Sequence, residues 1–166
     1  MKIPKEPIAL TKTDFVLEAC TILTSVFAIF FVAINYSSLP DTIPTHFGFN
    51  GKPDAYGNKL MIFLLLGICV AIYPLQKLSI KYPAFINYPF EIEEKNEIAH
   101  FQIAFTTVRL ITFLSALLLS YLVVVTILIA QGLHLNLAFP IVLSIPLVLL
   151  VPIAYTVYKR NRISGQ

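Results

Sequence analysis

The chain has 166 residues, of which 57% are apolar and only 13% are charged, and its mean hydropathy is +0.80. Soluble domains carry about 25% charged residues, so this composition excludes an ordinary soluble protein and favours one that is solvated by a lipid bilayer. The net charge of +3 comes without a basic run or interleaved basic and aromatic residues, which argues against a nucleic-acid partner. The two cysteines, Cys20 and Cys69, lie inside apolar runs and have neither disulfide nor metal-site spacing.

The first predicted membrane helix covers about residues 15–37. Residues 19–40 hold no charged side chain, and this run is long enough to span a bilayer. No small-residue cleavage site closes it, so we expect a retained helix rather than a signal peptide. Thr13 or Asp14 is the expected helix cap.

Glu18 is the only carboxylate within this predicted span. An ionisable residue inside a membrane helix is by default a candidate for function, such as the proton site of a small transporter. Glu18 also lies only about one turn into the helix. The alternative is therefore an interfacial side chain that reaches water or Lys12.

Three further membrane helices are predicted, at about residues 60–76, 108–130 and 138–158. The shortest of them, residues 60–76, is flanked by Lys59 and Lys77, whose ammonium groups can extend to opposite interfaces. The fold class expected is therefore an all-α integral membrane protein with four transmembrane helices and a single membrane domain.

The segment between the second and third predicted helices, residues 77–107, contains a helical pattern from about Glu93. Apolar residues recur there at intervals of three and four, which indicates one apolar stripe. We expect an amphipathic helix that either lies along the membrane interface or runs straight into the third span. The stripe consists of Ile98, Phe101, Phe105 and Val108.

Lysine and arginine are distributed unevenly among the segments between the predicted helices. The two tails and the middle segment, residues 77–109, hold ten of them, whereas the other two loops hold two. Since Lys and Arg accumulate on the cytoplasmic side, both termini are expected in the cytoplasm. The loop of residues 39–59 then faces outward.

This outward loop is predicted to fold rather than to remain a disordered connection. Loops longer than about 12–15 residues are usually functional or disordered, and Asn50-Gly51 is the strongest short signal for a β-hairpin. The arms of the hairpin are expected on either side of that pair. Phe47, Phe49 and Tyr56 are the expected aromatic anchors.

The polar side chains of the loop admit three interpretations. His46 and Asp54 can hold the loop in shape by hydrogen bonds, they can recognise a ligand, or they can join Asp41 in a metal or acid–base set. No nucleophile, phosphate-loop or dinucleotide motif occurs, so we expect no enzyme activity and no cofactor. The candidate ligand-binding residues are His46, Asn50, Asp54, Tyr56 and Lys59.

The pattern of a proline, then "IPTHF", then "NGKPDAYGNK" between two membrane helices resembles the bacterial family catalogued as the domain of unknown function numbered sixteen forty-eight. The same module is similar to the N-terminal part of SdpI-type immunity proteins. The resemblance covers roughly residues 15–110 and implies a protein of the bacterial cytoplasmic membrane. SdpI-type members protect a cell from a secreted peptide toxin, and they are longer than this chain.

Four hypotheses of function follow from these observations. The first is a non-enzymatic membrane protein whose outer loop recognises a peptide toxin or another membrane protein. The second is a small proton-coupled transporter, or a subunit of one, that uses Glu18. The third is a metal-dependent membrane enzyme built on His46. The fourth is a purely structural role, as a chaperone-like or assembly partner that binds no ligand.

Overall fold

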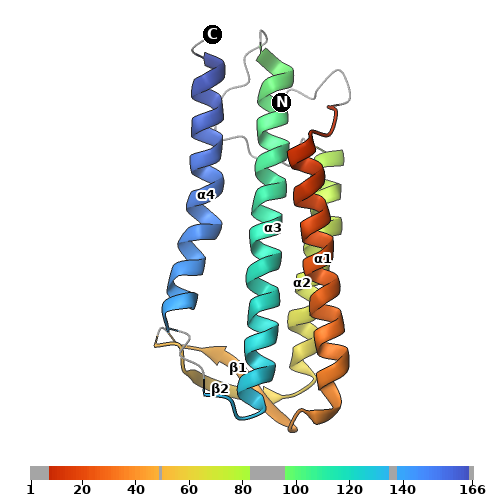
Figure 1. The fold of residues 1–166 in the computed structure, drawn as a ribbon, viewed down its shortest axis with the longest axis vertical. Helices are drawn as coiled ribbons and strands as arrows, with labels where there is room; N and C mark the ends of the chain where they lie inside the picture. Colours follow the sequence, from red (N-terminus) through yellow and green to blue (C-terminus); the bar gives the residue numbers. More distant parts are fainter. Residues whose placement is uncertain (1–7, 49, 83–95, 135–137, 165–166) are drawn as a thin grey trace.

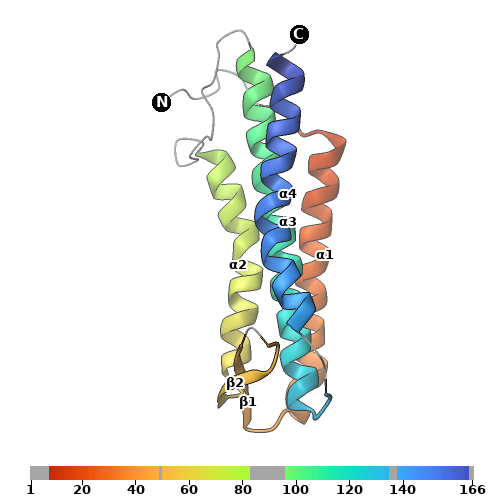
Figure 2. The ribbon, with the colours of Figure 1, turned by 90° about the vertical axis from the view of Figure 1, so that its left-hand side faces the viewer.

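The computed structural model describes residues 8–48, 50–82, 96–134 and 138–164, with no side chain described between 135 and 145. Four helices run up and down, and an antiparallel hairpin lies across the end of the bundle opposite the end of the last helix (Figures 1 and 2). In chain order the elements are α1 (Lys12–Asn35), a short 3-10 turn (Tyr36–Ser38), β1 (Thr42–Phe47), β2 (Pro53–Asn58), α2 (Met61–Lys81), α3 (Glu97–Ala130) and α4 (Ala138–Ser164).

Three helices within the described residues are long and apolar enough to cross a membrane. They are the first helix with its 3-10 extension, Lys12–Ser38, then α2 and α3. The prediction of a mostly helical membrane protein with a small hairpin is thereby confirmed. The helix α4 has 27 residues and runs beside α3 (Figure 1).

The central element is α3, which packs against α1, α2 and α4. It runs unbroken for 34 residues from Glu97, so the amphipathic segment continues into the third span instead of lying along the interface. Phe101 and Phe105 of the predicted stripe are buried, whereas Ile98 is 59% exposed. The predicted start at Glu93 lies outside the described residues.

The interface between α1 and α3 is built from small and polar residues. The buried positions of α1 follow one another at steps of four and three, the spacing of a coiled-coil seam. In lipid, large apolar side chains gain little by turning inward, and small ones allow helix axes to approach closely. The large apolar residues of α1, such as Phe27 and Phe30, are accordingly exposed. The buried positions are Asp14, Glu18, Thr21, Ser25, Ala28 and Val32.

The predicted cap of α1 is wrong, and α2 is longer than the predicted second span. The cap of α1 is Thr11, not Thr13 or Asp14: Asp14 stands three positions into the helix and completes a capping box with Thr11. The helix α2 extends to Lys81, beyond the predicted span of residues 60–76. Lys77 is therefore part of the helix, and its ammonium group bonds to another helix.

The hairpin is anchored to the bundle by an apolar cluster. Ile43 of β1 and Leu39, just before it, are 1% and 4% exposed. They pack with buried residues of three helices, which fixes the hairpin to the bundle end. A polar contact reinforces this end, because the amide of Gln131 donates to Asn35 at 3.1 Å and to Ser38 at 2.9 Å. The helical members of the cluster are Val32, Ile62, Val123 and Ile127.

Candidate functional site

The hairpin turns at Asn50 and Gly51, as its sequence predicts. The backbone N–H of Gly51 donates to the carbonyl of Gly48 at 2.8 Å, and the side chain of Asn50 accepts from the N–H of Lys52 at 3.0 Å. Gly51 has a φ of 71°, in the left-handed region that glycine adopts at low cost. The turn is thus fixed by its own hydrogen bonds.

His46 and Asp54 form a pair on the exposed part of the hairpin. Nδ1 of His46 contacts Oδ1 of Asp54, and the two side chains are 67% and 53% exposed. The strand register is irregular here, so that Thr45 on β1 and Asp54 on β2 each stand without a directly opposite residue. Irregularities of this kind change the direction in which side chains point from a strand. Here the irregular register is accompanied by contact between the side chains of Asp54 and His46.

Asp41 does not join this pair. It lies at the base of the hairpin, where its carboxylate is 3.0 Å from Nζ of Lys59 and its carbonyl accepts the N–H of Lys59 at 2.9 Å. His46 is five residues further along, or about 16 Å of extended strand. The hypothesis of a three-residue metal set is therefore wrong, and no group of three or more metal-ligating residues occurs within the described ranges.

A pocket opens between the hairpin turn and the end of α3. Its volume is about 670 Å³, and Asn50, Lys52 and Tyr56 line it from the hairpin. Tyr56 is 61% exposed, so it is not the buried anchor that the sequence suggested. The other expected anchors differ as well: Phe47 is half-buried, and Phe49 lies outside the described residues.

The opposite wall of this pocket is shaped by the way α3 ends. Gly132 has a φ of 92°; its N–H donates to the carbonyl of Ile129 at 2.9 Å, and the N–H of Leu133 donates to that of Leu128 at 3.0 Å. These two bonds form a Schellman motif. It turns the chain sharply and places Gly132, Leu133 and His134 along the pocket.

The five predicted ligand-binding residues therefore fall into three places. Asn50 and Tyr56 line the turn pocket. His46 and Asp54 form the exposed pair on the same hairpin. Lys59 lies at the base with Asp41, and its Nζ is 5.8 Å from the centre of the Tyr36 ring.

A second polar site lies inside the bundle, near the end opposite the hairpin. We call it the ion cluster, and its charged members are Asp14, Glu18, Lys77 and Arg109. Glu18 is 8% exposed, with Arg109 Nε 2.8 Å from one carboxylate oxygen and Lys77 Nζ 2.6 Å from the other. One carboxylate of α1 thus binds cations from both α2 and α3. The expectation that Glu18 reaches water or Lys12 at the interface is wrong, because its charge is compensated within the bundle.

Asp14 is the second carboxylate of this ion cluster and is fully buried. Thr106 and Gln102 of α3 each donate to it at 2.7 Å, as does the hydroxyl of Thr11. Nη1 of Arg109 lies 3.5 Å from it. Every oxygen of the two carboxylates has a partner, as a buried charge requires.

Sequence reasoning singled out Glu18 but missed its partners. Arg109 and Lys77 look like the ordinary basic residues that flank a membrane helix. A signal was present nonetheless: Asp14 and Glu18 are four residues apart, which places both on one face of a helix. A second charged helix is needed to neutralise such a face, and α3 supplies it through Arg109.

Comparison with known proteins identifies one segment of the chain. Residues 23–70 match the family described as "Domain of unknown function (DUF1648)", and this segment contains the second half of α1, the hairpin and the first half of α2. An "Uncharacterized protein" from Archaeoglobus fulgidus is 32% identical over 91 residues, which are 50% of each chain. The chain thus spans about half the length of that relative. No solved structure matches.

Proposed function

Taking residues 23–70 as a DUF1648 domain, we propose that this chain is a non-enzymatic protein of the bacterial cytoplasmic membrane whose hairpin recognises a partner outside the cell. The partner is a membrane-active peptide toxin or another membrane protein. The likeness of the loop motif to SdpI-type immunity proteins makes a peptide toxin the first choice. In this proposal all four helices cross the membrane, with both termini in the cytoplasm.

The distribution of charge supports this orientation. Ten of the twelve Lys and Arg residues lie within residues 1–12, 77–109 and 159–166, and the other two are Lys52 and Lys59 of the hairpin region. The start of α1, the end of α2 and the end of α4 lie at one end of the bundle, opposite the hairpin (Figure 1). By the positive-inside rule, the hairpin end faces out.

The observation that carries the proposal is an anchored hairpin with exposed side chains. Ile43 is 1% exposed and ties the hairpin to the bundle, while His46, Asp54 and Tyr56 remain more than half exposed. A rigid platform lowers the entropy cost of binding, and tyrosine is enriched among residues that dominate protein interfaces.

The proposal is tested by measuring the survival of cells that produce the protein when they are exposed to a panel of membrane-active peptide toxins. The site variants are His46→Ala and Tyr56→Ala, and the control is Thr42→Ala, an exposed residue of β1 that lines neither the turn pocket nor the pair. At equal membrane levels, the wild type and the control should protect and the site variants should not. Undiminished protection by both site variants would contradict recognition through the hairpin.

A second candidate function, a small proton-coupled transporter or a subunit of one, is favoured by one specific observation. Glu18 is a buried carboxylate within an apolar helix, held by cations from two other helices, and such residues often mark ion or proton pathways. Glu18→Gln should then abolish substrate efflux from intact cells. Efflux at the wild-type rate would leave the ion cluster with a structural role alone.

A further inference from the structure

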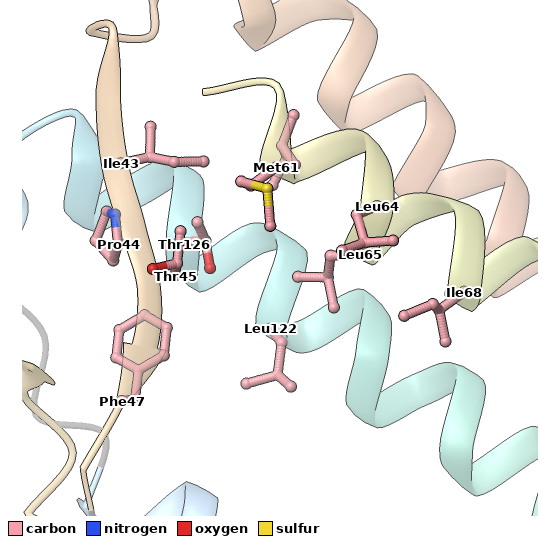
Figure 3. Close-up of a pocket in the computed structure, with 11 residues that line it drawn as sticks. Ile43, Pro44, Thr45, Phe47, Met61, Leu64, Leu65, Ile68, Leu122 and Thr126 are labelled. Atoms are coloured by element: carbon pink, nitrogen blue, oxygen red, sulfur yellow. The ribbon is translucent and has the colours of Figure 1, made fainter. Parts of the chain in front are cut away.

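A groove of about 210 Å³ lies between β1 and the helices α2 and α3. Figure 3 shows β1 along one side of it and side chains of the two helices along the other. Eleven described residues line the groove, and nine of them are apolar. Its two polar lining residues are Thr45 and Thr126, so the groove suits an apolar occupant with very few polar atoms.

The rim of the groove is exposed along α2. Met61, Leu64 and Ile68 are 45%, 58% and 48% exposed, although all three are apolar. They occupy a helix that is long and apolar enough to cross a membrane. Their exposed surface is therefore solvated by lipid chains, and the groove opens to the bilayer rather than to water.

Thr126 is a buried residue whose side chain lines the groove, and its hydroxyl has no hydrogen-bond partner in the described part of the structure. It is 4% exposed. Other threonines of α3 form hydrogen bonds within the helix. The hydroxyls of Thr107 and Thr112 donate to the backbone carbonyl four residues earlier, at 2.8 and 2.9 Å. The hydroxyl of Thr126 is therefore free to donate to a group inside the groove, and a hydrogen bond to an acceptor on an occupant would stabilise the complex.

We propose that the groove holds one acyl chain of a diacyl phospholipid, with the hydroxyl of Thr126 donating a hydrogen bond to the ester carbonyl. Thr126 is four residues from the end of α3, or about 6 Å along the helix axis. The predicted third span ends at residue 130, so Thr126 lies in the outermost part of the hydrocarbon core, close to the level of the lipid ester groups. Thr45, at the β1 bulge, offers a second hydroxyl on the opposite wall.

The size and polarity of the groove favour a lipid acyl chain over a whole small molecule or an extended peptide. Its volume is below the range of about 300–1,000 Å³ for pockets that take whole small molecules. An extended peptide would bring an N–H and a C=O at every residue, and two threonine hydroxyls cannot satisfy them. An acyl chain brings a single carbonyl. The inference does not depend on what the hairpin recognises.

Native mass spectrometry of the full chain in detergent tests the proposal with two lipids of equal chain length and headgroup. One is a diacyl phosphatidylglycerol and the other is its dialkyl ether analogue, which lacks the carbonyl. A hydrogen bond contributes about 0.5–1.5 kcal/mol, so the wild type should bind the diacyl lipid about 2- to 13-fold more tightly. Thr126→Val keeps the side-chain shape and should bind both lipids equally.

Two further variants separate filling of the groove from a general loss of fold. Leu122→Phe enlarges a lining residue and should weaken binding of both lipids, whereas Leu117→Phe, on an exposed position of α3 outside the groove, should change neither. Circular dichroism and the thermal midpoint confirm that each variant is folded. The proposal is overturned if the wild type does not discriminate, if Thr126→Val still discriminates, or if protein from native membranes carries an adduct of peptide mass instead of lipid mass.

Discussion

Removing the charge of Arg109 is the most informative perturbation of this protein. Its guanidinium is 7% exposed and lies 2.8 Å from Glu18 and 3.5 Å from Asp14, so it is the one cation of the described cluster that contacts both carboxylates. Arg109→Met keeps the length of the side chain and deletes the charge. The two carboxylates then lose their shared partner within the bundle.

The size of the effect follows from burial. Breaking a buried ion pair by removing one partner costs about 3–5 kcal/mol, because a charge remains uncompensated in a medium of low dielectric constant. Lys77 is the matched comparison: it binds the same carboxylate, but its side chain is 45% exposed. Water solvates such a pair in part, so we expect Lys77→Met to cost about 1 kcal/mol or less.

Unfolding in mixed micelles with a rising fraction of sodium dodecyl sulfate, followed by circular dichroism, measures both free energies. The expected order of destabilisation is Arg109→Met, then Glu18→Gln, then Lys77→Met. Glu18→Gln is intermediate because Arg109 keeps its contact with Asp14. If Arg109→Met unfolds no more readily than Lys77→Met, the assignment of Arg109 as the shared partner of the ion cluster is refuted.

Three other substitutions test the hairpin and the first helix. Ile43→Ala should cost about 2–5 kcal/mol, because it leaves a cavity at a site that is 1% exposed, and it should speed proteolysis at the hairpin turn; an unchanged cleavage rate would contradict the anchoring role. Gly51→Ala should cost about 1–2 kcal/mol at its positive φ, whereas Gly67→Ala, with open space around it in α2, should not destabilise in the same unfolding titration. Thr11→Ala removes the capping box of α1 and should cost about 0.5–2 kcal/mol, a result that an unchanged unfolding midpoint would contradict.

The sequence alone determined the features that depend on neighbouring residues. Charge-free apolar runs predict membrane helices because a bilayer accepts little else of that length. The Asn50-Gly51 pair predicts the hairpin because the turn needs a residue that tolerates positive φ, and Gly51 has it. The loop motif likewise pointed to the family that residues 23–70 match.

Only the tertiary structure decided which distant side chains meet. Glu18 and Arg109 are 91 residues apart, and Glu18 and Lys77 are 59 apart. Nothing in the local pattern shows that two basic residues at helix boundaries turn inward to one carboxylate. The same holds for Thr126, a buried residue that lines a groove formed where β1 packs against α2 and α3. Periodicity states which face of a helix is polar, but the packing of the helices decides what that face binds.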